Sequence, residues 1–113
     1  MSSPTRVTDE IIFEQPVSFV RLPKMYVAKI KAGETTPSVK DLIRFTTQNT
    51  SPLTVTNLLD GADGQEIIIV GDGNTTLQHG THIFNDSGAN LLLAVNKAYS
   101  YLRINDKWIQ VKG

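Results

Sequence analysis

His79 and His82 are the residues of this sequence whose type best suits a metal ion, because histidine is the commonest metal ligand in proteins. They are separated only by Gly80 and Thr81. Side chains three positions apart on an extended strand point to opposite faces. The pair therefore converges on one ion only if the chain turns at Gly80, or if a threefold axis gathers copies of one histidine. We interpret both as turn or surface residues and predict no metal site.

Two short acidic runs, residues 60–64 and 72–74, have the composition of calcium loops or of turns. A calcium loop needs several oxygen ligands and usually a final bidentate carboxylate at a fixed spacing, and Glu66 follows Asp60 too soon to supply it. Asp-Gly and Gly-Asn pairs are typical of turns, so we predict turns at both runs. The predicted turn motif comprises Asp72, Gly73, Asn74, His79 and Gly80.

Catalysis by a nucleophile requires a base and an orienting group beside it. Serine and threonine are numerous, but none lies in a Gly-x-Ser-x-Gly elbow. A glycosidase pair remains open for Asp60, Asp63, Glu66 and Asp72, because any two carboxylates can meet in space. A chain of 113 residues lacks the mass for both a rigid β scaffold and a substrate cleft. We predict that the protein is not an enzyme and has neither catalytic residues nor cofactors.

Three aromatic residues near the C-terminus could form a platform for sugar, since their rings combine flat apolar faces with a polar edge. Tyr99 and Tyr101 share one face of a predicted strand. The position of Trp108 relative to them depends on the intervening turn. Packing in the core or between subunits is the favoured interpretation, and contact of Tyr99 and Tyr101 with a surface glycan is the alternative.

The charge pattern argues against two classes of partner. Lys and Arg number 11, Asp and Glu also number 11, and no block of one sign stands out. Nucleic acids and anionic membranes both favour clustered basic residues. No apolar run approaches the roughly 18 residues of a spanning helix, and an apolar secretion signal is also missing. We therefore expect no nucleic-acid partner and no membrane insertion.

Short apolar runs between Gly, Asn, Asp, Ser and Thr predict an all-β chain with many turns. The clearest element is a C-terminal hairpin of residues 99–104 and 107–112, because Asn105 and Asp106 tolerate the positive φ of a two-residue turn. Even spacing of the strands favours a small β-sandwich, a barrel or β-helix-like rungs. The other predicted strands are 10–13, 17–22, 25–31, 42–46, 53–58, 65–70, 75–78, 82–84 and 90–94.

A polar stretch with Gly33 and Pro37 indicates a boundary near Thr35. Residues 1–34 are predicted to supply strands for docking or subunit exchange, and residues 35–113 a β module. The runs 67–70 and 91–93 are apolar at consecutive positions, so both faces of these strands require burial. A second layer or neighbouring copies must provide it. The candidate residues for subunit packing are Ile67, Ile69, Leu91, Leu93 and Trp108.

Residues 49–58, 64–69, 71–80 and 107–109 resemble a module found in tail fibres, tailspikes and other appendages of tailed bacteriophages. The most specific feature is Asp-Gly-Asn-Thr-Thr followed by His-Gly. The resemblance covers about residues 35–113. It implies a β-rich, often trimeric module with β-helix-like rungs, which serves attachment or structure and has no catalytic residues of its own.

The predicted function is that of a structural virion protein, a homotrimeric tail or appendage component that contacts other virion proteins and is made in the host bacterial cytoplasm. Closed symmetry is the usual arrangement of identical subunits that cover one another. Two alternatives stay open. One is a module that recognises host-surface glycan through exposed Tyr or Trp, and the other is a trimeric capsid decoration protein.

Overall fold

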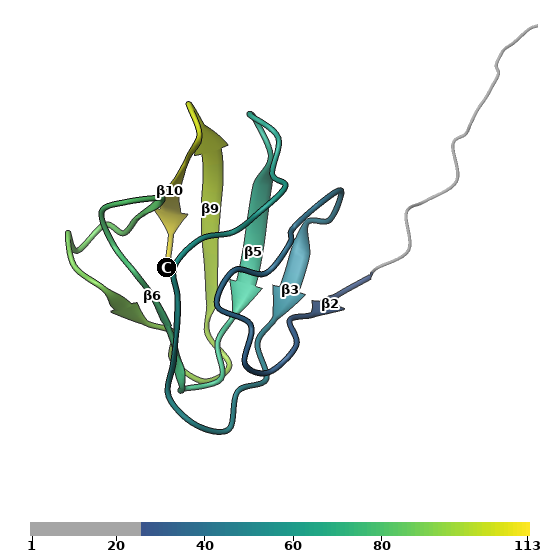
Figure 1. The fold of residues 1–113 in the computed structure, drawn as a ribbon, viewed down its shortest axis with the longest axis vertical. Helices are drawn as coiled ribbons and strands as arrows, with labels where there is room; N and C mark the ends of the chain where they lie inside the picture. The colour runs from purple at the N-terminus through teal and green to yellow at the C-terminus, as the bar shows by residue number, and fades with distance from the viewer. Residues whose placement is uncertain (1–25) are drawn as a thin grey trace, which may run out of the picture.

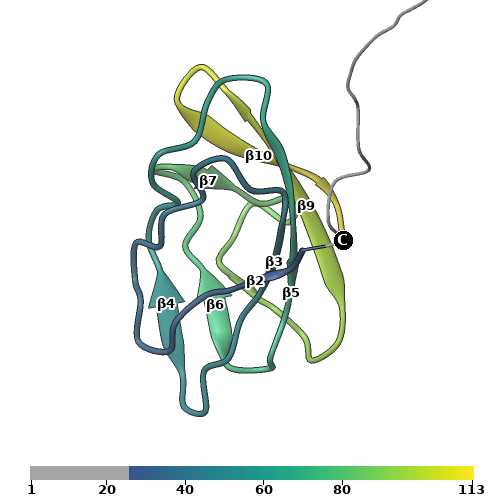
Figure 2. The same ribbon diagram turned by 90° about the vertical axis from the view of Figure 1, so that its right-hand side faces the viewer.

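Two β-sheets pack face to face in the computed structural model, which describes residues 26–113 (Figures 1 and 2). The larger sheet has six strands in the order β2-β3-β5-β9-β10-β7, and the smaller sheet has three in the order β4-β6-β8. The bounds are β2 Ala28–Lys29, β3 Arg44–Thr46, β4 Leu53–Val55, β5 Glu66–Val70, β6 Thr75–Leu77, β7 Ile83–Phe84, β8 Leu91–Leu92, β9 Ala98–Ile104 and β10 Lys107–Lys112. These residues include no helix of the length and apolarity needed to cross a membrane. The predicted all-β class is confirmed.

The chain alternates between the two sheets from β3 to β9, and its first passes lie side by side, β3 beside β5 and β4 beside β6. In the larger sheet β3 runs parallel to β5, with Arg44 opposite Ile68. In the smaller sheet β4 runs parallel to β6, with Leu53 opposite Thr75. Parallel neighbours require a connection that crosses back to the starting edge, and here each connection contains a strand of the other sheet. The fold is a β-sandwich. In its middle part, each turn of the chain through one strand of each sheet forms a rung, and successive rungs lie parallel to one another.

The C-terminal hairpin is confirmed, because β9 and β10 pair antiparallel with Lys107 opposite Ile104. Asn105 and Asp106 have φ angles of 51° and 63°, as a two-residue turn with positive φ requires. Each predicted strand between residues 42 and 94 contains a strand of the structure. The strands are shorter than predicted, since the chain leaves each ladder to cross to the other sheet. The predicted strands 10–13 and 17–22 lie outside the described residues.

Residues on both sides of Thr35 belong to one packed unit. Ala28 and Ile30 lie in the same buried cluster as Phe45, and β2 pairs with β3 through Ala28 opposite Phe45. A boundary near Thr35 therefore does not divide two cores. The role in docking or exchange predicted for residues 1–34 concerns a segment that lies mostly outside the described residues.

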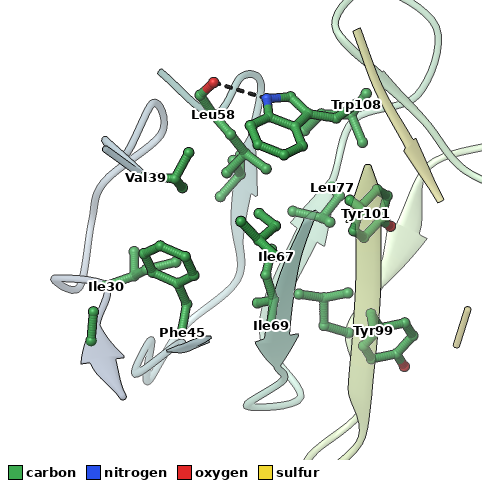
Figure 3. Packing of buried hydrophobic residues seen from close by; sticks show 14 residues of the cluster. Ile30, Val39, Phe45, Leu58, Ile67, Ile69, Leu77, Tyr99, Tyr101 and Trp108 are labelled. Carbon is green, nitrogen blue, oxygen red and sulfur yellow. Dashed lines mark hydrogen bonds between the residues drawn. The ribbon is translucent and has the colours of Figure 1, made fainter. Parts of the chain in front are cut away.

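The core lies between the sheets and is filled by alternate side chains of their strands (Figure 3). Tyr101 and Tyr99 of β9 lie opposite Ile67 and Ile69 of β5, so all four buried side chains are on the inward side of the larger sheet. Trp108 is fully buried and donates its indole N–H to the Leu58 carbonyl at 3.0 Å. Burial of apolar area stabilises a fold by roughly 25 cal/mol per Å². A single chain thus covers the inward faces of both its sheets.

Candidate functional site

Asp72, in the connection between β5 and β6, ties two successive rungs together. Its carboxylate accepts hydrogen bonds from the backbone N–H groups of Asn49, Asn74 and Thr75 at 2.6, 2.7 and 2.9 Å. The Thr75 hydroxyl also donates to it at 2.9 Å. The Asn49 amide donates to that hydroxyl at 2.8 Å, and the Asn74 amide donates to the Asn49 carbonyl at 2.9 Å. The turn after β5 is therefore locked to the loop that follows β3.

The environment of Asp72 favours the ionised carboxylate. Burial by itself raises its pKa, but hydrogen bonds from the backbones of Asn74 and Asn49 oppose burial. The side chains of Thr75 and Thr47 add to this effect, and the pKa lies below its ordinary value. A carboxylate engaged in this way stabilises the fold. It is poorly suited to the acid or base role of a glycosidase pair, which requires a group free to exchange protons with substrate.

His79 shapes the turn between β6 and β7. Its Nδ1 accepts a hydrogen bond from the Asn85 backbone N–H at 3.0 Å, and its ring meets Phe84 edge-on with centroids 5.6 Å apart. Gly80 follows with a φ of 105°, which favours glycine. Residues 26–113 contain no group of three or more His, Cys, Asp or Glu residues placed to hold a metal ion.

The tyrosines assigned to glycan contact lie inside the sandwich, which corrects that assignment. Tyr99 is 3% exposed and Tyr101 is 0% exposed. The Tyr101 hydroxyl donates to the buried Asn85 Oδ1 at 2.6 Å, and the Tyr99 hydroxyl accepts from the Ala94 N–H at 2.9 Å. Burial, and to a lesser extent Tyr99 and Asp86, raise the pKa of Tyr101, so its phenol stays protonated. Neither ring offers a face to sugar.

The assignment of subunit packing also changes in the structure. Ile67, Ile69, Leu93 and Trp108 are at most 1% exposed within the single chain, and Leu91 is partly buried against the same core. Packing of the two sheets against each other covers these side chains, so they leave no surface for another copy. The alternation of β5 instead turns Ile68 outward. The run of consecutive apolar positions did not indicate which of these isoleucines faces outward.

The outward side of the larger sheet is apolar at its centre. Ile68 of β5 and Ile109 of β10 are each 36% exposed, and the nearby Ile43 and Val111 are 55% and 52% exposed. A solvated sheet face normally carries polar side chains at such positions. We call this surface the outer face. It comprises Ile43, Arg44, Glu66, Ile68, Val70, Ala98, Ser100, Leu102, Lys107, Ile109, Val111 and Lys112.

Two shallow hollows meet at Ile68 on the outer face. The first is lined by Ile43, Gln65, Glu66 and Ile68. The second is lined by Ile68 together with residues 98–100 and Lys112. Ile68 therefore stands as an apolar ridge between two depressions. Such a surface suits packing against a complementary protein surface better than it suits binding a small molecule, because neither hollow encloses its contents.

A comparison with family models gives the decisive observation. The model described as phage depolymerase C-terminal beta sandwich domain matches residues 27–103. The chain belongs to this family. As a depolymerase C-terminal sandwich domain it is a virion-associated structural domain of the phage tail. No curated protein and no solved structure gives a significant match.

Membership of the depolymerase C-terminal sandwich family agrees with the architecture. The match begins at Val27, beside β2, and thus includes the residues before Thr35 that share the core. It ends at Arg103, near the end of β9. The resemblance to tailed-phage appendage modules and the predicted β-sandwich class are both confirmed.

Proposed function

We propose that this chain is a non-catalytic, homotrimeric module of a phage tail appendage, in which copies pack through their outer faces. The apolar centre of the outer face, with Ile68 between two hollows, carries the proposal. Burying such a surface stabilises association, because water is released from apolar side chains. Closed symmetry lets every copy cover the same face without leaving one unpaired.

The hydrogen bonds and ion pairs of three candidate acidic residues support a non-catalytic role. Asp72 is committed to the lock between rungs. Asp60 accepts the Ser38 hydroxyl at 2.6 Å, and Asp63 lies 3.9 Å from Arg103. Tyr99, Tyr101 and Trp108, the three rings considered as a sugar platform, are buried. Each of these groups is explained by its part in the fold.

The assembly state tests this proposal directly. Light scattering of the full chain at micromolar concentration is expected to give three times the 12.4 kDa mass of one chain. Ile68→Arg is expected to give a folded monomer, because association would bury an unpaired charge at a cost of several kcal/mol. Leu92→Arg is the matched control, since Leu92 is 54% exposed on the smaller sheet and its variant should remain a trimer. A monomeric wild-type chain at this concentration would refute the proposal.

The tail is the proposed location, since the family of the match is tail-associated. Gold-labelled antibodies against the purified chain are expected to mark the tail appendages of intact particles in electron micrographs. A head decoration protein shares the small size and the trimeric symmetry but would place the label evenly over the capsid. Labelling confined to the capsid would therefore favour that alternative.

A further inference from the structure

The two hollows of the outer face carry opposite charges at their margins. Glu66 lines the hollow on the β3 side of Ile68, and Lys112 lines the hollow on the β10 side. Both side chains are exposed. The ion pairs formed within residues 26–113 all involve Arg103, so neither Glu66 nor Lys112 is neutralised by a partner there. Within residues 26–113, Glu66 therefore lies without an ion-pair partner in one half of the outer face, and Lys112 lies without one in the other half.

Strand register fixes where these charges lie relative to Ile68. Ile68 and Lys112 both lie opposite Ser100 of β9, on either side of it. Neighbouring strands are about 4.8 Å apart, so Lys112 is roughly 10 Å from Ile68 across the sheet. Glu66 is two residues before Ile68 and points to the same side of β5. A single chain therefore holds the two charges apart, with the apolar ridge and β9 between them.

A cyclic trimer joins unlike patches, because each copy offers one half of its face to the copy before it and the other half to the copy after it. With the threefold axis near Ile68, the half with Ile43 and Glu66 meets the half with Val111 and Lys112 of the next copy. Apolar residues then meet apolar residues, and the acid meets the base. This rotation matches the two halves of the outer face in polarity, and it brings Glu66 of one copy toward Lys112 of the next.

We infer that Glu66 of each subunit pairs with Lys112 of the neighbouring subunit, which gives three identical ion pairs around the trimer axis. This inference rests on the proposed trimer and specifies how its copies are oriented. Exposed ion pairs contribute little affinity. Their larger effect is on orientation, because a wrong arrangement places like charges together. The apolar ridge supplies attraction, and the Glu66–Lys112 pair selects one arrangement.

The outer face also contains two other charged residues, Arg44 and Lys107. Arg44 is opposite Ile68 on β3, so it belongs to the same half as Glu66. Lys107 is opposite Ile104 next to the hairpin turn and lines neither hollow. Lys107 nevertheless belongs to the proposed interface, so the control for Lys112 is Lys40, an exposed base that lies outside the outer face.

Charge reversal tests the pair in the full chain. Glu66→Lys and Lys112→Glu are each expected to raise the concentration at which half the trimer dissociates by about fivefold or more, because each places like charges in contact three times per trimer. The double variant, which exchanges the two charges, is expected to return within about twofold of wild type. Lys40→Glu should leave the midpoint unchanged, because Lys40 lies outside the outer face. Sedimentation equilibrium at low ionic strength measures all four, and high salt should shrink the differences.

The results distinguish a failure of the Glu66–Lys112 pair from a failure of the proposed trimer. A wild-type chain that is monomeric at every concentration refutes both. A trimeric wild type whose double variant is as weak as the single variants refutes the ion pair alone. Circular dichroism checks that each variant keeps its sheets. If a charge-reversal variant fails to fold, the neutral variants Glu66→Gln and Lys112→Gln are measured instead. Each must make trimer dissociation less dependent on salt; otherwise the ion pair is refuted.

Discussion

Replacing Trp108 by alanine is expected to lower the free energy of unfolding by about 3–5 kcal/mol, the usual cost of removing a buried indole. Such a loss is a large part of the roughly 5–15 kcal/mol that stabilises a typical domain. Trp108 is 0% exposed and joins β10 to the segment after β4 through its hydrogen bond to Leu58. Arg103 lies over its ring at 5.6 Å, and Gly61 packs so close that a side chain there would meet it.

Urea unfolding followed by circular dichroism, at one fixed protein concentration, measures this effect. Trp108→Phe keeps an apolar ring but leaves the Leu58 carbonyl without its donor, so a smaller loss of about 1–3 kcal/mol is expected. Val95→Ala is the control, because Val95 is 64% exposed and its truncation should change stability by about 0.5 kcal/mol or less. An alanine variant at position 108 that unfolds within 1 kcal/mol of wild type would contradict the role assigned to the indole.

Replacing Asp72 by asparagine is expected to cost about 2–3 kcal/mol at pH 7, because an amide cannot accept the same set of hydrogen bonds on both its terminal atoms. The cost should also depend on pH. The folded state holds the pKa of Asp72 below its ordinary value. Its contribution to stability is therefore fully present above the unfolded pKa of about 3.9 and is lost as the pH falls through the lower folded pKa.

Wild type and Asp72→Asn are thus expected to differ most at neutral pH and to converge in acid below about pH 4. Urea midpoints at a series of pH values measure this convergence. Asp41→Asn is the matched control, since it removes the same charge from an exposed position whose φ of 58° asparagine tolerates. A difference between wild type and Asp72→Asn that is equal at all pH values would show that ionisation of Asp72 does not stabilise the fold.

The sequence predicted the turns and most strands, because these depend on residues that are close together in the chain. Asn105 and Asp106 could be placed in a tight turn because their side chains tolerate positive φ. Most strand positions followed from β-branched runs between turn residues. The order of strands did not follow, because the parallel pairing of β7 with β10 and the position of β9 beside β5 depend on contacts distant in sequence.

The candidate site was harder to predict than the fold. Ile67, Ile68 and Ile69 are alike in the sequence, and only the register of β5 decides which of them face the core. Asp72 was expected in a turn, but its bond to Asn49 joins residues 23 positions apart and has no local signal. Glu66 and Lys112 become notable only once both are placed on the outer face.

The position of β9 has a consequence for how the protein is made. Translation adds residues from the N-terminus at about 5–20 per second, so β5 leaves the ribosome well before β9, which lies beside it in the finished sheet. Until residues 98–104 emerge, Ile67 and Ile69 lack the tyrosines that cover them. The larger sheet is therefore incomplete at its centre until β9 has been made. We expect a product truncated before residue 98 to leave this part of the core open to water, and such open states are the ones that proteases cleave.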